Sequence, residues 1–88
     1  TKIKGSSVNA ELNKAMSFVV HSEGGKEVLY EFYLMEKGQW TLVQRYSRKN
    51  FYSFIPFHKG SYKLLVLSKS YHKKLSYEDY DIFEFMVN

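Results

Sequence analysis

Apolar and polar residues alternate with a period of two along most of this chain, and this pattern constrains its fold more than any other feature. In "EVLYEFYLME" (27–36), Tyr30, Phe32 and Leu34 share one face. The segment "YDIFEFMV" (80–87) alternates in the same way. Because a strand points successive side chains to opposite faces, each segment has one face suited to a core. The pattern therefore predicts strands rather than helices.

Several other segments have the same strand character. They are an N-terminal stretch near 2–8 and the segments 15–21, 39–47, 50–56 and 60–70. Turn signals separate the strands, including the glycine pair at 24–25 and Lys37-Gly38. Helical periodicity is weak except at 10–16, which we interpret as irregular structure and strand.

Six or seven short strands with turns every 8–12 residues predict an all-β fold. The predicted architecture is an antiparallel β-sandwich of about seven strands, immunoglobulin-like or fibronectin type III-like. The lack of intervening helices argues against a parallel α/β sheet. A closed, five-stranded oligonucleotide-binding barrel is the least favoured alternative, and sheet topology distinguishes it from the sandwich.

The apolar faces of these strands define a predicted core. Apolar residues make up 44% of the 88 residues and aromatic residues 18%, which is enough to fill the core of one domain. The predicted core comprises Trp40, Tyr52, Phe54, Tyr62, Leu64, Val66, Phe83 and Phe85.

Tyr62 is predicted to form a tyrosine corner. It lies two residues after Gly60, at the start of a strand late in the chain. In immunoglobulin-like sandwiches a tyrosine at such a place packs its ring and bonds its hydroxyl to upstream backbone. We therefore expect the Tyr62 hydroxyl to contact backbone within 54–59.

The polar connection at 71–79 holds the candidate contact residues for a partner or a glycan. These are Tyr71, Tyr77, Lys73 and Lys74. Exposed tyrosines offer amphipathic contact area. The alternative, which general surface statistics favour, is that these rings only cap the open end of a sandwich.

No residue pattern predicts catalysis, a metal site or a cofactor. Cysteine is absent, and the three histidines, His21, His58 and His72, lie on separate segments without ligand spacing. The carboxylates of Glu78, Asp79 and Asp81 lack an EF-hand pattern and are interpreted as an acidic strand edge.

The basic residues do not predict specific nucleic-acid binding. They form two clusters, one of Lys69, His72, Lys73 and Lys74 and one of Arg45, Arg48 and Lys49. A net charge of +4 is mild for this length, so we interpret both clusters as solvated faces. The longest apolar runs are far too short to span a bilayer, so no membrane insertion is expected.

A series of residues in one order resembles a known family. The series is Trp40…Tyr46-Ser47…Asn50-x-Tyr52-x-Phe54-x-Pro56…Gly60-x-Tyr62. It resembles the three-Y (triple tyrosine) domain of two-component regulators and of repeats in clostridial surface proteins, over about 28–87. The family often has tryptophan where Phe54 stands. The resemblance implies a β-sandwich without catalytic function, outside the cytoplasmic membrane.

The resemblance sets the functional expectation. Residues 1–88, which start at Thr1 rather than methionine, are expected to be one module of a larger protein. The module is expected to act as a spacer, protein-interaction or signal-coupling domain, with neighbouring domains of the parent chain or another protein as partners. The alternative is a module that binds cell-wall glycan.

Overall fold

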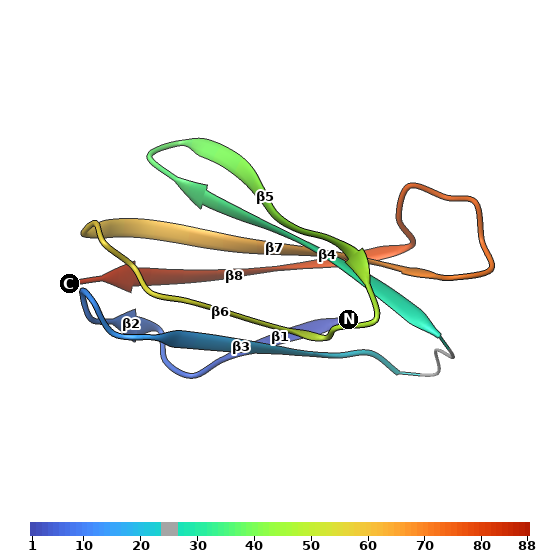
Figure 1. Cartoon of the computed structure of the whole chain (residues 1–88), viewed down its shortest axis with the longest axis horizontal. Helices are drawn as coiled ribbons and strands as arrows, with labels where there is room; N and C mark the ends of the chain where they lie inside the picture. Colours follow the sequence, from blue (N-terminus) through green and yellow to red (C-terminus); the bar gives the residue numbers. More distant parts are fainter. Residues whose placement is uncertain (24–26) are drawn as a thin grey trace.

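The computed structural model describes residues 1–23 and 27–88, and these form eight strands in two sheets without a helix (Figure 1). The strands are β1 (Lys2–Gly5), β2 (Asn9–Ala10), β3 (Met16–His21), β4 (Val28–Glu36), β5 (Gln39–Ser47), β6 (Phe51–Phe54), β7 (Gly60–Ser70) and β8 (Asp79–Val87). The all-β sandwich prediction is confirmed. The turn predicted at 24–25 lies outside the described residues.

The two sheets have the orders β1-β3-β6 and β2-β8-β7-β4-β5. They form the two layers seen in Figure 1, and neither is the closed five-stranded barrel of the third alternative. The described residues hold one strand more than the predicted seven, because β2 has only two residues and too little sequence for an alternation signal. β2 also pairs parallel with β8, which departs from a purely antiparallel sandwich.

The core lies between the layers and is built around an aromatic cluster. The Phe85 ring centroid is 5.3 Å from those of Phe18 and Tyr62, and 5.9 Å from that of Phe54. Phe18 comes from the small sheet and Phe85 and Tyr62 from the large one, so the cluster joins the two layers. Aromatic pairs at such separations stabilise a core beyond the area that they bury.

Seven of the eight predicted core residues lie in or against this core. Tyr62, Leu64, Val66 and Phe85 are buried. The other three, Tyr52, Phe54 and Phe83, are partly buried and pack against the buried cluster.

The prediction that Trp40 is buried is wrong, because its side chain is 42% exposed. Trp40 lies opposite Met35, and Leu42 lies opposite Tyr33, both on the face turned away from the small sheet. The register then shifts, so that Val43 is an extra residue and Gln44 lies opposite Phe32. A bulge of this kind moves the following side chains to the other face. The bulge therefore brings Gln44 to the inner face beside Phe32, while Val43, which lies on the face opposite to Trp40, packs against the core.

Backbone conformation and a side-chain contact fix two edges of the sandwich. Lys37 (φ 52°) and Gly38 (φ 77°) form the tight turn between β4 and β5, as a two-residue hairpin turn with positive φ at both positions requires. At the opposite edge of the large sheet, Asp81 Oδ2 accepts a 2.8 Å hydrogen bond from the Ile3 backbone nitrogen. β1 is thereby tied across to β8.

Candidate functional site

The Tyr62 hydroxyl lies between two acceptors at one end of the sandwich. It is 2.8 Å from the His58 carbonyl oxygen and 2.7 Å from Glu36 Oε2. The first contact confirms the predicted tyrosine corner. The second was missed, because the pairing of Glu36 with Tyr62 across β4 and β7 has no signal in either strand's sequence. The Tyr62 hydroxyl is thus shared between two acceptors, His58 in the β6–β7 connection and Glu36 at the end of β4. These contacts hold the connection against β4.

Replacing Tyr62 by phenylalanine is expected to lower the free energy of unfolding by about 0.5–1.5 kcal/mol, the usual net value of one hydrogen bond. The ring would still fill its place, so only the hydroxyl contacts are lost. Urea melts measure the change. Tyr71→Phe is the matched control and should be neutral, since Tyr71 is 59% exposed. A neutral Tyr62→Phe would show that the corner does not stabilise the fold.

Two tyrosines are expected to ionise only at high pH. Burial raises the pKa of Tyr62 to about 12, and the hydrogen bond to Glu36 and its charge act in the same direction. Burial likewise raises the pKa of Tyr46 to about 12, together with the charge of Glu31 and with Tyr33.

These raised pKa values predict alkaline unfolding. A tyrosine ionises at about 10 in an unfolded chain. The stabilisation linked to Tyr62 and Tyr46 should therefore be complete below pH 10 and be lost as the pH rises through 12. Tyrosinate absorbance and circular dichroism, followed together, test this. A single titration near pH 10 with the fold intact would contradict the raised pKa values of Tyr62 and Tyr46.

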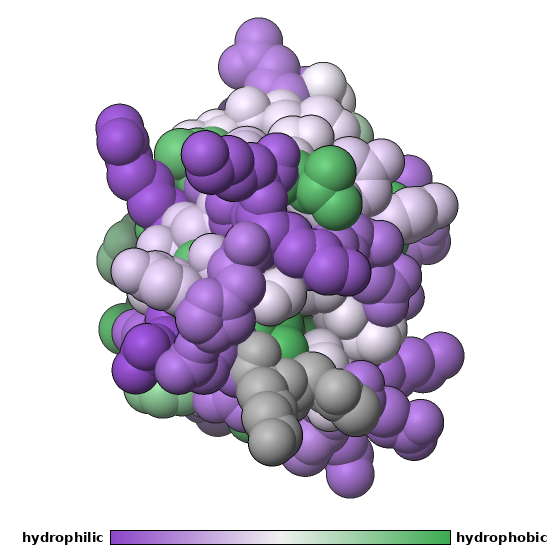
Figure 2. Space-filling view, turned by 90° about the vertical axis from the view of Figure 1, so that its right-hand side faces the viewer, coloured by the Kyte–Doolittle hydropathy of each residue, from purple (hydrophilic) through white to green (hydrophobic). Residues whose placement is uncertain are grey.

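The predicted contact residues lie on the β7–β8 loop, and all four are exposed. The Tyr71 ring meets His72 edge-on, and Tyr77 meets Tyr80 in the same way. The loop end of the sandwich is covered mainly by hydrophilic residues (Figure 2). Lys73 and Lys74 thus belong to a solvated surface. The rings of Tyr71 and Tyr77 lie on the same surface, each against a different aromatic neighbour.

Hydrogen bonds from the strands hold this loop in place. Glu78 accepts from the Ser70 backbone nitrogen at 2.6 Å and from Lys73 Nζ at 3.1 Å. The Tyr46 hydroxyl donates to the Ser76 carbonyl at 2.6 Å. Lys73 of the basic cluster and Glu78 of the acidic group are therefore engaged in the loop's own contacts.

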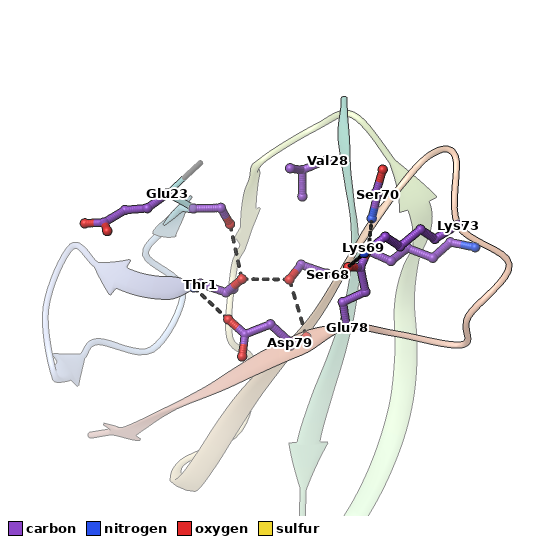
Figure 3. Close-up of a pocket in the computed structure, with 10 residues that line it drawn as sticks. Thr1, Glu23, Val28, Ser68, Lys69, Ser70, Lys73, Glu78 and Asp79 are labelled. Atoms are coloured by element: carbon purple, nitrogen blue, oxygen red, sulfur yellow. Dashed lines mark hydrogen bonds and ion pairs between the residues drawn. The ribbon is translucent and has the colours of Figure 1, made fainter. Parts of the chain in front are cut away.

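A polar pocket of about 340 Å³ lies at the base of the loop (Figure 3). The Thr1 hydroxyl is 2.7 Å from the Ser68 hydroxyl, and the Thr1 nitrogen donates to Asp79 Oδ2 at 2.8 Å. The Ser70 backbone hydrogen bond, with help from Lys73, holds the pKa of Glu78 below its ordinary value. An ionised carboxylate carries no proton to donate, so Glu78 is not suited to act as a general acid.

The acidic residues at the start of β8 and His72 form contacts with other segments of the chain. Asp79 and Asp81 accept hydrogen bonds from the N-terminal segment, so they join β8 to β1 rather than only guarding a free edge. His72 forms an ion pair with Glu27 when it is protonated. Within residues 1–23 and 27–88, no three histidine or carboxylate side chains are arranged to hold a metal ion.

One surface was not predicted from the sequence. The outer face of the large sheet exposes Trp40, Leu42 and Ile82, which come from β5 and β8. The sequence signal for this surface was that Leu65 and Leu67 make the second face of β7 partly apolar. Among the described residues, no helix is long and apolar enough to cross a membrane.

Comparison with known proteins gives one match. The model of the Y_Y_Y domain family matches residues 21–88. No curated protein and no solved structure matches the chain significantly. The matched range contains β4 to β8, and so includes four of the five strands of the large sheet and the Tyr62 corner.

Proposed function

The chain belongs to the Y_Y_Y domain family, and on this basis we propose that it is a non-catalytic module of an extracytoplasmic bacterial protein. In that protein it links neighbouring domains and couples them through contacts on its own surface. The family match over 21–88, more than three quarters of the chain, is the observation that carries the proposal.

The shape of the molecule supports a linking role. Its extents are 40 × 23 × 15 Å, with the strands running along the long direction (Figure 1). Two sheets joined by a shared aromatic core form a stiff body, since packed interiors resist deformation. A stiff, elongated body transmits a displacement from one end to the other, which a flexible linker does not.

Surface labelling of intact cells tests the proposed location. In cells that produce the parent protein, a membrane-impermeant amine reagent should label exposed lysines such as Lys37 and Lys74 before lysis. Mass spectrometry of the module's peptides reads the result. Labelling only after lysis would overturn the extracytoplasmic assignment.

Domain exchange tests the coupling role. Replacing this module in the parent protein by an unrelated β-sandwich of similar length should reduce the parent's output, because the native surface contacts are lost. If an unrelated sandwich restores full output, the coupling role is contradicted and only the spacer role remains.

A further inference from the structure

An apolar belt crosses four strands on the outer face of the large sheet. The register places Leu42 opposite Tyr33 and Tyr33 opposite Leu65. Leu65 in turn lies opposite Ile82 on β8. Trp40 lies two residues before Leu42 and shares its face. Cross-strand neighbours on one face of a sheet lie close enough to touch, so these five residues form a continuous strip. We call this strip the outer belt; it consists of Tyr33, Trp40, Leu42, Leu65 and Ile82.

The outer belt is open to solvent. Trp40, Leu42 and Ile82 are 40–42% exposed. An antiparallel sheet with one face on the core normally carries polar residues on its other face. The small sheet follows that rule in part: Lys2 lies opposite His21 on its outer side, and an exposed apolar pair, Val19 opposite Phe51, lies beside them. A contiguous exposed apolar strip on a folded domain marks a binding surface.

The charged groups beside the outer belt are paired with one another. Lys63 Nζ lies 3.6 Å from Glu84 Oε1. Glu31 accepts a 2.6 Å hydrogen bond from the Tyr33 hydroxyl and a 3.3 Å bond from the Tyr46 backbone nitrogen. Lys63 and Glu84 offset each other's charge, and Glu31 is held by two neutral donors. The belt is therefore flanked by hydrogen-bond donors and acceptors with little net charge.

From this combination we propose that the outer belt binds a neutral glycan chain, with sugar rings stacked on Trp40 and Tyr33. The C–H face of a pyranose packs against the negatively polarised face of an aromatic ring. Its hydroxyl groups are uncharged donors and acceptors, which match the Lys63–Glu84 pair. The inference names a partner for the interaction module proposed above and rests on that function.

The size of the outer belt favours a narrow ligand over a folded protein. Five large side chains of up to about 250 Å² each, none more than about two-fifths exposed, leave at most on the order of 500 Å² of surface. A stable protein–protein interface uses about 800 Å² from each partner. A single-stranded nucleic acid would need cations along its backbone in addition to rings, whereas Lys63 is held by Glu84.

Trp40 provides a direct probe of binding, because it is the only tryptophan of the chain. The 88-residue chain is titrated with cellohexaose and with chitohexaose, two uncharged β-1,4-linked hexasaccharides. We expect a saturable change in Trp40 fluorescence with at least one of them. Amide NMR shifts should concentrate on the belt residues of β4, β5, β7 and β8. A hexamer of galacturonic acid, which is anionic, should bind more weakly.

Two variants locate the site. Trp40→Ala should weaken binding about tenfold, measured by NMR or calorimetry, because truncating a central aromatic anchor is costly. Tyr71→Ala removes an aromatic ring of greater exposure from the loop and should leave binding unchanged. An unaltered NMR spectrum away from each substitution shows that the fold is kept.

Three outcomes would overturn the inference. They are no saturable response to either hexasaccharide, shifts that gather on the loop around Tyr71 and Tyr77, and a Trp40 signal that depends on protein concentration without glycan. The last outcome would assign the belt to a second copy of the chain. The cell-surface labelling above does not depend on any glycan, so its positive result with a failed titration would remove only this inference.

Discussion

Replacing Phe85 by alanine is expected to lower the free energy of unfolding by about 3–5 kcal/mol. Phe85 is only 3% exposed, and its ring lies among those of Phe18, Tyr62 and Phe54 from both sheets. Truncation would leave a cavity at the point where the layers meet. For a domain whose total stability is on the order of 5–15 kcal/mol, such a loss should bring the urea midpoint down sharply.

Two further substitutions serve as controls for Phe85→Ala. Phe54→Ala should cost less, because Phe54 is only partly buried. Trp40→Ala should cost within about 0.5 kcal/mol, as for surface substitutions generally. Equal losses from Trp40→Ala and Phe85→Ala in urea melts would show that the register of β5 is wrong.

Gly5→Ala is expected to destabilise the domain by about 1–3 kcal/mol through overpacking. A Cβ added at Gly5 would lie 2.7 Å from Phe83 Cζ and 2.9 Å from its Cε1. The Phe83 ring has little freedom to retreat, because it packs edge-on against Phe18 at a centroid distance of 5.6 Å. β1 thus approaches β8 closely enough that only glycine fits.

A double-mutant cycle tests the cause of the Gly5 effect. In a Phe83→Leu background, Gly5→Ala should cost clearly less than in the native chain, because the smaller side chain leaves room for the new methyl group. Thermal or urea unfolding of the four proteins gives the coupling energy. Additive costs would show that the effect comes from backbone conformation rather than from contact with Phe83.

The alternation in the sequence was sufficient to predict the fold class and most of the core. Along β7, Tyr62, Leu64 and Val66 face inward as the period of two requires. The prediction depends only on local sequence, and a regular strand keeps its local period throughout its length.

The errors arise where pairing between distant segments decides the structure. The pairing of Trp40 with Met35 and the bulge at Val43 are both set by the register of β5 against β4, so the sequence of β5 alone placed Trp40 on the face of Gln44. The contact of Tyr62 with Glu36 likewise depends on which strands are neighbours. The outer belt was missed for the same reason, since it consists of residues that become adjacent only across four strands.

The parallel pairing of β2 with β8 determines how the module responds to tension along the chain. Asn9 lies opposite Met86 and Ala10 opposite Val87, with hydrogen bonds from Met86 N to Val8 O and from Asn88 N to Ala10 O of 3.0 and 2.9 Å. Pulling on the two ends of the chain slides these parallel strands past each other. The bonds between them are then loaded in shear and share the force, instead of opening one after another as in a zipper. The β2–β8 pair, together with β1 on β3, is therefore expected to carry the load when the two ends are pulled apart.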